Sequence, residues 1–452
     1  MADLIKPGHM KEEFTGLGRL LAYSAGMAGW SILMNTISVM IIYFYLPPDN
    51  SGLPVLIPNK GILGIFTMFS LILASGRLID AVTDPLIAWF SDRTRSKRGR
   101  RIPFMMIAVV PSVVFCVLLF FPLQQTESTM NYMWLFVMQS LFYIFLTMYI
   151  VPFNALMPEL ARDKEKKLRL STLLSFMFVA GIIIASQIPQ IATSIDKRFS
   201  FKDPQESYQL AILIVVLIGM CCMMMPLFVV DENKYCNPVA SRINLFRSLH
   251  KSFSNRRFMI FLAADASFFI TLALVSSGIL YYVSVLLGLP EKLGSFAMAM
   301  MILLSLLFYP AVIRLASRYG KKRLIILSFL IFSLLFLFIS GMGKYGLSAE
   351  FQLYLIGAIA SFPVAVLGIL PYALVAEMAD EDAAKSGEKT EGMYFAIRTF
   401  ADKLGQTLGV MGFAICTLFG RDPGNDMGIR LSAWAGFAVC VLAAAIFTKF
   451  RE

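Results

Sequence analysis

A series of long apolar segments recurs along the whole chain and constrains the fold more than any other feature. These segments reach the roughly 20 residues that a helix needs to cross a bilayer. Because lipid offers no hydrogen-bond partners to the backbone, we expect them to be helices. The alternating segments of about ten residues that mark membrane β-barrels are absent from the sequence. Twelve spanning helices are predicted, at about 18–46, 61–91, 102–122, 131–158, 170–193, 208–230, 257–287, 294–316, 323–342, 351–378, 391–420 and 431–449.

The positions of the basic residues predict how the chain crosses the membrane. The net charge is +11, but the Lys and Arg residues gather in alternate loops, which argues against nucleic-acid binding. Cytoplasmic loops are the ones that carry an excess of Lys and Arg. Both termini are therefore expected in the cytoplasm, in a multi-pass protein of the inner membrane. The basic segments are 92–101 with six such residues, 159–169 with five, 231–257 with six and 317–323 with four; 194–207, with three, is the exception.

The two halves of the chain repeat weakly. Pro85 and Pro310 each lie several residues before the end of a predicted helix. Each of these helix ends is followed by a segment that contains Gly and several basic residues. A chain of six plus six helices with repeated halves is typical of a transporter whose site lies between two bundles. We expect an N-terminal bundle at 1–230, a cytoplasmic loop at 231–256 and a C-terminal bundle at 257–452.

The predicted second helix carries a charged cluster at membrane depth. Ionisable groups there cost about 2.5–3.5 kcal/mol each on insertion scales, so they indicate a function. Arg77, Asp80 and Asp84 share one helix face, and the two acids lie about 6 Å apart along the axis. Such carboxylates suit Na⁺ or a shared proton, and Thr83 and carbonyls loosened by Pro85 could add oxygens. The alternative is a salt-bridge ladder without an ion.

A second charged cluster lies in the predicted eleventh helix. Arg398 and Asp402 are four residues apart and should pair, whereas Lys403 points about 100° away from Asp402. Lys403 is therefore the expected counter-charge of Asp80 and Asp84 across a cavity. Alternatively, Lys403 extends to the membrane interface or only forms a structural pair.

Three segments resemble the glycoside-pentoside-hexuronide:cation symporters, the melibiose permease family of the major facilitator superfamily. They are RLIDAVTDPLIAWFSDRTRSKRGRRIPF at 77–104, VPFNALMPEL at 151–160 and EGMYFAIRTFADKLGQTLG at 391–409. The resemblance implies an all-α fold of two six-helix bundles. It also implies that Asp80 and Asp84 bind the coupling cation, that Thr83 and Thr147 add ligands, and that Lys403 lies nearby.

The galactoside-binding part of that family's pattern is not kept. Ser31 stands where melibiose permease has an acid in its first helix, and Ile150 replaces a second acid. Asn154 replaces a Trp, and Ser175 or Leu174 replaces an arginine. A galactoside substrate is therefore not expected.

Other polar and aromatic residues are candidates for substrate contact or for gating. Ser31 and Asn35 form a polar stripe beside Trp30, although helix–helix hydrogen bonding explains such a stripe equally well. Asp265 could partner Lys403, gate the cytoplasmic side or bind substrate. The candidate substrate contacts are Trp30, Ser31, Asn35, Tyr143, Tyr149, Asn154, Gln187 and Asp265. The candidate gate residues are Asp92, Arg93, Arg100, Glu159, Glu377 and Arg398, with loop 92–101 contacting Glu159 and Glu377.

Together these features predict a symporter that couples Na⁺ or H⁺ entry to uptake of a sugar, a glycoside or a related small solute. We expect no enzymatic activity and no cofactor besides the coupling ion, in a monomer embedded in the bilayer. The first alternative is a Na⁺-coupled transporter of lysophospholipids. The second is a non-transporting sensor or an intramembrane enzyme, which the lack of a nucleophile–base pair disfavours.

The predicted topology can be tested with C-terminal fusions. A reporter that is active only in the periplasm should be inactive there, and a cytoplasmic reporter should be active, because the basic loops stay inside. Periplasmic activity of the C-terminal fusion would refute the topology.

Overall fold

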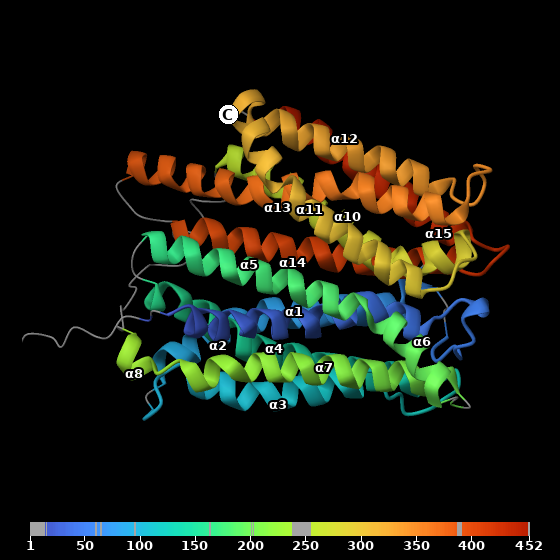
Figure 1. Ribbon diagram of the computed structural model, residues 1–452, viewed down its shortest axis with the longest axis horizontal. Coiled ribbons are helices and arrows are strands. Elements are labelled where there is room, and N and C mark those ends of the chain that lie inside the picture. The colour runs from blue at the N-terminus through green and yellow to red at the C-terminus, as the bar shows by residue number, and fades with distance from the viewer. Residues whose placement is uncertain are drawn as a thin grey trace, which may run out of the picture.

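The structure, a computed structural model, is built almost entirely of long helices (Figure 1). It describes residues 14, 16–58, 61–63, 66–94, 96–161, 164–199, 201, 203–236, 255–386 and 391–450. The N-terminal helices are α1 Leu17–Tyr45, α2 Met68–Arg93, α3 Ile102–Leu118, α4 Met130–Leu160, α5 Lys164–Ser186, α6 Ile188–Phe199, α7 Pro204–Val229 and α8 Glu232–Tyr235. The C-terminal helices are α10 Arg256–Tyr281, α11 Lys292–Tyr319, α12 Lys321–Ser340, α13 Ala349–Ser386, α14 Glu391–Cys416 and α15 Met427–Thr448. Short segments are η1 Asp49–Ser51, η2 Tyr282–Leu286, η3 Thr417–Phe419, β1 Gly61–Leu63 and β2 Phe66–Thr67.

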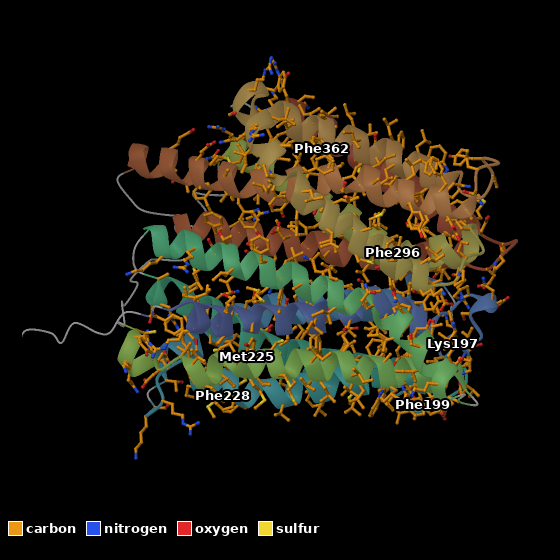
Figure 2. All side chains as sticks on the ribbon, viewed as in Figure 1. Lys197, Phe199, Met225, Phe228, Phe296 and Phe362 are labelled. Carbon is orange, nitrogen blue, oxygen red and sulfur yellow. The ribbon has the colours of Figure 1, made fainter. Side chains whose placement is uncertain are left out.

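The lengths and compositions of these helices fit repeated membrane crossing. In the described part of the chain, nine helical segments are long and apolar enough to span a bilayer, and α5 and α6 together form one of them. The shorter apolar helix α3 and the long but charged helices α2 and α14 bring the number of crossings to the twelve expected. Large apolar side chains cover the outside, for example Phe228 on α7, which is 79% exposed, and Phe296 on α11 (Figure 2).

Several helix boundaries predicted from the sequence are wrong; for example, the helix expected to end at 378 continues to Ser386. The helix expected from residue 61 begins at Met68, because Thr67 and Ser70 cap it reciprocally and β1 pairs with β2 before it. The helix expected at 170–193 is interrupted after Ser186 and continues as α6. Pro189 has no N–H to donate to the preceding turn, which accounts for a break at this point.

The helices pack in two groups, which occupy the lower and upper parts of Figure 1. In the N-terminal group, α1 packs against α5 and α7, while α4 packs against α2 and α3. In the C-terminal group, α10 packs against α14 and α15, and α13 packs against α11 and α12. The groups meet where α14 lies on α2, α1 on α10, and α11 on α5 and α6. A site between the groups is therefore bordered by α1, α2, α10 and α14.

The two groups are bonded together at the end remote from the chain termini. Tyr43 of α1 and Tyr208 of α7 both donate hydrogen bonds to the carboxylate of Glu291, which precedes α11. Further bonds between the groups join Tyr281 to the carbonyl of Leu46 at 2.7 Å, Asn50 to that of Ser284 at 2.8 Å and Arg421 to that of Pro47 at 3.2 Å. At the terminal end, the described ion pairs, such as Arg257–Glu381, stay within one group. The described contacts thus close the remote end.

Close approach of α1 and α7 depends on glycine. A Cβ atom at Gly29 would lie 2.4 Å from the carbonyl oxygen of Gly219, so the backbones would have to separate. Small residues at helix contacts allow this kind of packing in membranes.

The variant Gly29→Ala should lower the free energy of unfolding by about 1–3 kcal/mol, the range seen for overpacked cores. The thermal unfolding midpoint of the purified protein measures the effect. Gly18→Ala on the same helix is the matched control, because no atom lies within 4 Å of its added Cβ. Equal midpoints for the two variants would contradict the close α1–α7 contact.

Candidate functional site

The charged centre of the molecule lies where α2 meets α14, between the two helix groups. The Lys403 Nζ is 2.9 Å from the Asp80 Oδ2 and 2.6 Å from the Asp84 Oδ2. The side chains of Asp80 and Lys403 are 7% and 15% exposed, and that of Asp84 is 31% exposed. The two acids reach one ammonium group because they stand on the same face of α2, one turn apart. The structure thus brings together the three residues that the sequence placed at the candidate cation site.

Hydroxyl groups complete the surroundings of Asp80. Thr147 of α4 donates a hydrogen bond to the Asp80 Oδ1. Thr83 instead donates to the carbonyls of its own helix, at 2.9 Å from Ile79 and 3.1 Å from Asp80. The Asp84 Oδ1 is buried and has no hydrogen-bond partner among the residues that the structure describes. One carboxylate oxygen at this centre therefore lacks a donor, which is costly in a membrane interior.

Arg77 does not take part in this ion-pair cluster. Its guanidinium donates to the Gln406 Oε1 at 3.1 Å and lies over the ring of Tyr143, 5.3 Å from the centroid. Among the described ion pairs, none joins Arg77 to Asp80 or Asp84, so the salt-bridge ladder is not what the structure contains. Lys403 rather than Arg77 balances the two acids.

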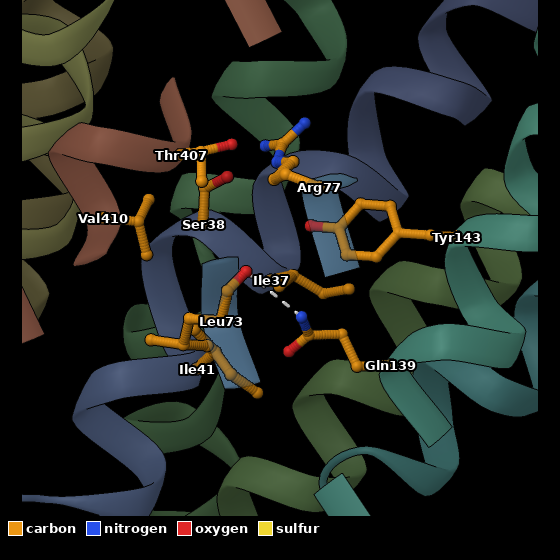
Figure 3. Close-up of a pocket in the computed structure, with 9 residues that line it drawn as sticks. All are labelled: Ile37, Ser38, Ile41, Leu73, Arg77, Gln139, Tyr143, Thr407 and Val410. Carbon is orange, nitrogen blue, oxygen red and sulfur yellow. Dashed lines mark hydrogen bonds between the residues drawn. The ribbon is translucent and has the colours of Figure 1, made fainter. Parts of the chain in front are cut away.

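A small cavity with a mixed polar and aliphatic lining adjoins Arg77 (Figure 3). Its volume is about 10 Å³, which is about enough for one water molecule. Arg77, Ser38, Tyr143 and Thr407 border it, together with Gln139, whose amide donates to the Ile72 carbonyl at 2.9 Å. This cavity is too small for a sugar, so the described conformation holds α1, α2 and α14 close together at this depth.

The polar stripe of α1 is partly used in packing. The Ser31 hydroxyl donates to the Phe178 carbonyl at 2.7 Å, and Trp30 stacks on the ring of Phe178 at 6.0 Å. These contacts hold α1 against α5. Asn35 is partly exposed, and its amide donates to the Ser31 carbonyl at 2.8 Å. Of the stripe, Asn35 has most access to a ligand.

The other candidate substrate contacts fall in different places. Tyr149 is fully buried, and its hydroxyl donates to the Met223 carbonyl at 3.1 Å. Its side chain therefore points into the interior of the N-terminal helix group and away from the cavity. Asn154 is exposed on α4. Gln187, at the break between α5 and α6, lies with its Nε2 3.5 Å from the Ser295 carbonyl of α11. Tyr143 remains beside Arg77 at the cavity.

Asp265 pairs with Arg398 and not with Lys403, the partner that the sequence analysis considered. The Arg398 Nε is 2.6 Å from its Oδ2, and the second contact of this guanidinium, to the Oδ1, is 3.3 Å. The expected pair of Arg398 with Asp402 is longer, at 3.9 Å. Both Asp265 oxygens therefore accept from Arg398, and among the described ion pairs Asp265 is joined to Arg398 and not to Lys403.

The expected gate residues form ion pairs within each helix group. Glu159 is 3.1 Å from Arg100 and 2.8 Å from Arg101, so loop 92–101 contacts Glu159 as expected. Glu377 pairs instead with Lys321, which corrects its assignment to that loop. The side chains of Asp92 and Arg93 lie outside the described part of the chain.

Three partners in these networks escaped the sequence reasoning. Gln406 binds Arg77, Glu291 joins the two groups, and Tyr372 lies 3.9 Å from the Arg398 guanidinium. Gln406 follows Lys403 by three residues, so extending the face of that helix would have found it. Glu291 stands out as an acid in a loop with a single basic residue, which was a usable signal.

A family model described as MFS/sugar transport protein matches residues 22–420. The chain belongs to this family. The resemblance to the glycoside-pentoside-hexuronide:cation symporters of the major facilitator superfamily is thereby confirmed. The family consists of transporters and not of enzymes, so the protein is a multi-pass membrane protein of a sugar symporter family.

Individual relatives and solved structures agree with the family assignment. A putative glycoside/cation symporter of Escherichia coli, YagG, is 23% identical over 94% of this chain and 88% of its own length. The mouse sodium-dependent lysophosphatidylcholine symporter 1 is 22% identical over 75% of this chain and 69% of its own. The crystal structure of the nucleoside transporter NupG superposes with a TM-score of 0.67 at 13% identity, covering 96% of this chain and 100% of that one. That likeness confirms the major facilitator fold.

Removal of the shared ammonium should destabilise this member of the family. Lys403→Ala leaves Asp80 and Asp84 facing each other without a counter-charge, and breaking a buried pair in this way costs about 3–5 kcal/mol. The unfolding midpoint should therefore fall steeply at alkaline pH and recover as pH falls, because protonation of one acid removes the repulsion.

The double variant Lys403→Ala/Asp84→Asn is the control for the Lys403 prediction. It should regain much of the lost stability at alkaline pH, since only one carboxylate remains. Equal losses in the single and double variants would show that Lys403 acts by packing and not by charge.

Proposed function

We propose that the protein is a symporter of the inner membrane that couples entry of Na⁺ or H⁺ to uptake of a sugar, a glycoside or a related small organic solute. The observation that carries this proposal is the Lys403 ammonium shared by Asp80 and Asp84 between the two helix groups. A cation that competes with Lys403 for the two carboxylates would break this ion pair between the helix groups. In this proposal both termini lie in the cytoplasm.

The charge balance of this cluster supports a monovalent cation. Two carboxylates and one ammonium sum to −1, so one monovalent cation or proton brings the cluster to zero. The buried Asp84 Oδ1, which has no donor, is one available ligand. The Asp80 carboxylate and the Thr147 hydroxyl beside it supply others. Thr83 would add its hydroxyl only after turning away from its own helix. In this assignment Na⁺ is a transported ion and not a resident cofactor.

Coupling follows from competition between the cation and Lys403 for the same oxygens. A bound cation screens the acids and releases Lys403, which weakens the attachment of α14 to α2. The N-terminal bundle, 1–230, and the C-terminal bundle, 257–452, can then rock relative to each other. Substrate that prefers the rearranged bundles must also strengthen cation binding, because coupling between sites is reciprocal.

The described conformation supports a direction for this movement. The remote end is held shut by Tyr43, Tyr208 and Glu291, so we assign the structure to the state in which the site is reached from the terminal, cytoplasmic side. Arg100 and Glu159 would make a gate at that side. Asn35, Tyr143, Asn154 and Gln187 are the proposed substrate contacts, with Trp30 and Ser31 supporting them from α1.

A second candidate substrate is an amphiphile such as a lysophospholipid. A groove of about 550 Å³ runs beside α6, where Gln187, Gln190 and Arg198 alternate with apolar residues. A polar and apolar lining of this kind suits a molecule with a headgroup and a chain. Thermal stabilisation of the purified protein by glycosides, with and without Na⁺, would favour the sugar assignment. Stabilisation by lysophosphatidylcholine alone would favour the amphiphile.

The variant Asp84→Asn should lose cation binding, because it removes one of the two charges and the oxygen without a donor. Calorimetric titration of purified protein with NaCl against choline chloride, repeated across a pH series, measures this. At pH values where wild type binds Na⁺, the variant should bind it at least tenfold more weakly, which corresponds to about 1.4 kcal/mol.

Asp49→Asn is the matched control for the Asp84 variant, because Asp49 is an exposed acid at the remote end. Its Na⁺ binding should equal that of wild type. If Asp84→Asn keeps the full Na⁺ and pH dependence of wild type, the acids of α2 are structural.

A further inference from the structure

A second group of buried charges lies wholly within the C-terminal helix group. Arg398 binds Asp265 of α10 at 2.6 Å and 3.3 Å and lies 3.9 Å from the Asp402 Oδ2. The side chains of Arg398 and Asp265 are only 3% and 1% exposed, and that of Asp402 is 12% exposed. These three residues, called here the α14 triad, have no part in the Asp80–Asp84–Lys403 cluster.

The α14 triad has one more negative charge than positive charge if both acids are ionised. The guanidinium of Arg398 stays protonated at all relevant pH values and can only donate. It directs its two short bonds to Asp265, so Asp402 receives only the 3.9 Å contact. An uncompensated carboxylate in this setting is costly. The triad therefore needs one more positive charge.

The oxygens of Asp402 indicate what supplies that charge. Its Oδ1 is buried and has no hydrogen-bond partner among the described residues. An ionised carboxylate without a donor is costly at this depth, whereas a protonated carboxyl carries no charge. A single proton on Asp402 therefore brings the triad to neutrality. A metal ion fits less well, because hard cations such as Ca²⁺ take about six to eight oxygen ligands and Arg398 occupies those of Asp265.

We propose that Asp265, Arg398 and Asp402 form a proton-binding site in the C-terminal bundle, separate from the proposed cation site on α2. The proton is held by Asp402, and Arg398 fixes the position of Asp265. Asp402 is the group that gains and loses the proton.

The neighbours of α14 define what else acts on this proton. Asp402 and Lys403 are consecutive but point about 100° apart on the helix, so the ammonium of Lys403 faces α2 while Asp402 faces α10. Among the described residues, α15 bears its charged groups near its ends. Among the described residues, the charged or titratable groups that contact α14 include Arg77, Asp80 and Asp84 on α2, Asp265 and Tyr281 on α10, Tyr282 of η2 and Tyr372 on α13. Arg430 lies on α15, and Lys449 follows the end of that helix.

The protonation state should control how α14 is held. With the proton bound, Arg398 pairs fully with Asp265 and the α10–α14 contact is neutral. Without it, Asp402 competes with Asp265 for the guanidinium, and the stacking of Arg398 on Tyr372 is disturbed. Because α14 also carries Lys403, this proton would adjust the attachment of α14 to α2. The inference therefore adds a pH-dependent site to the proposed symporter but does not require that its coupling ion be Na⁺.

Infrared spectroscopy of the purified protein tests the site directly, because a protonated carboxylic acid has a carbonyl stretch that an ionised one lacks. Wild type should show a band of this kind that disappears as pH rises. Asp402→Asn should remove it, whereas Asp84→Asn should keep it. Asp402→Glu retains an acid and should shift the band in frequency. A band that is unchanged in Asp402→Asn would overturn the proposal.

Na⁺ titration of the same variants separates this inference from the proposed function. Asn has nearly the shape and the same charge as protonated Asp, so Asp402→Asn keeps the triad in its neutral form and should fold and bind Na⁺ within about twofold of wild type. Loss of Na⁺ binding in this variant, in correctly folded protein, would overturn the separate site. If wild type itself bound no Na⁺ but kept the Asp402-dependent band, the α14 triad would stand without the Na⁺ site.

Discussion

The lysine shared by two aspartates at the boundary of the helix groups is the interaction on which the rest of the structure depends. Lys403 reaches Asp80 and Asp84 only because α14 lies directly on α2. That contact places α14 close to α10 as well, where a Cβ at Gly405 would lie 2.4 Å from the Ala266 carbonyl oxygen. In a medium that solvates charge poorly, three ionisable groups that meet in this way fix the depth and rotation of both helices.

Much of the fold and part of the candidate site could be predicted from the sequence. Because a bilayer allows few backbone structures, the lengths of the apolar segments predicted the twelve spanning helices. The four-residue spacing of Asp80 and Asp84 predicted that they share one helix face. The attachment of Lys403 to them followed from charge, because few basic groups lie at that depth. The interruption before Pro189 was visible in principle, since proline removes a helix hydrogen bond.

Contacts between helices that are far apart in the sequence were harder to predict. The bond between Asp265 and Arg398 joins residues 133 positions apart, and no periodicity within either helix indicates it. For the same reason the inward position of Tyr149 and the pairing of Glu377 with Lys321 were missed. Packing decides which of several faces of a helix meets a neighbour. From a single sequence, the contacting face can be predicted only where charged residues or glycines mark it.

The remote closure joins the carboxylate of Glu291 to two tyrosine hydroxyls, and none of the described ion pairs crosses it. Glu291 accepts from Tyr43 and Tyr208, and the nearby bonds between the groups mostly end on backbone carbonyls. Separating these partners parts no opposite charges over a distance, so the Debye length of the surrounding solution has little influence on the step. What opening requires is water, because the freed carboxylate and phenols must be hydrated as they part. Water must therefore reach this end of the interface between the helix groups whenever the Glu291 contacts are broken.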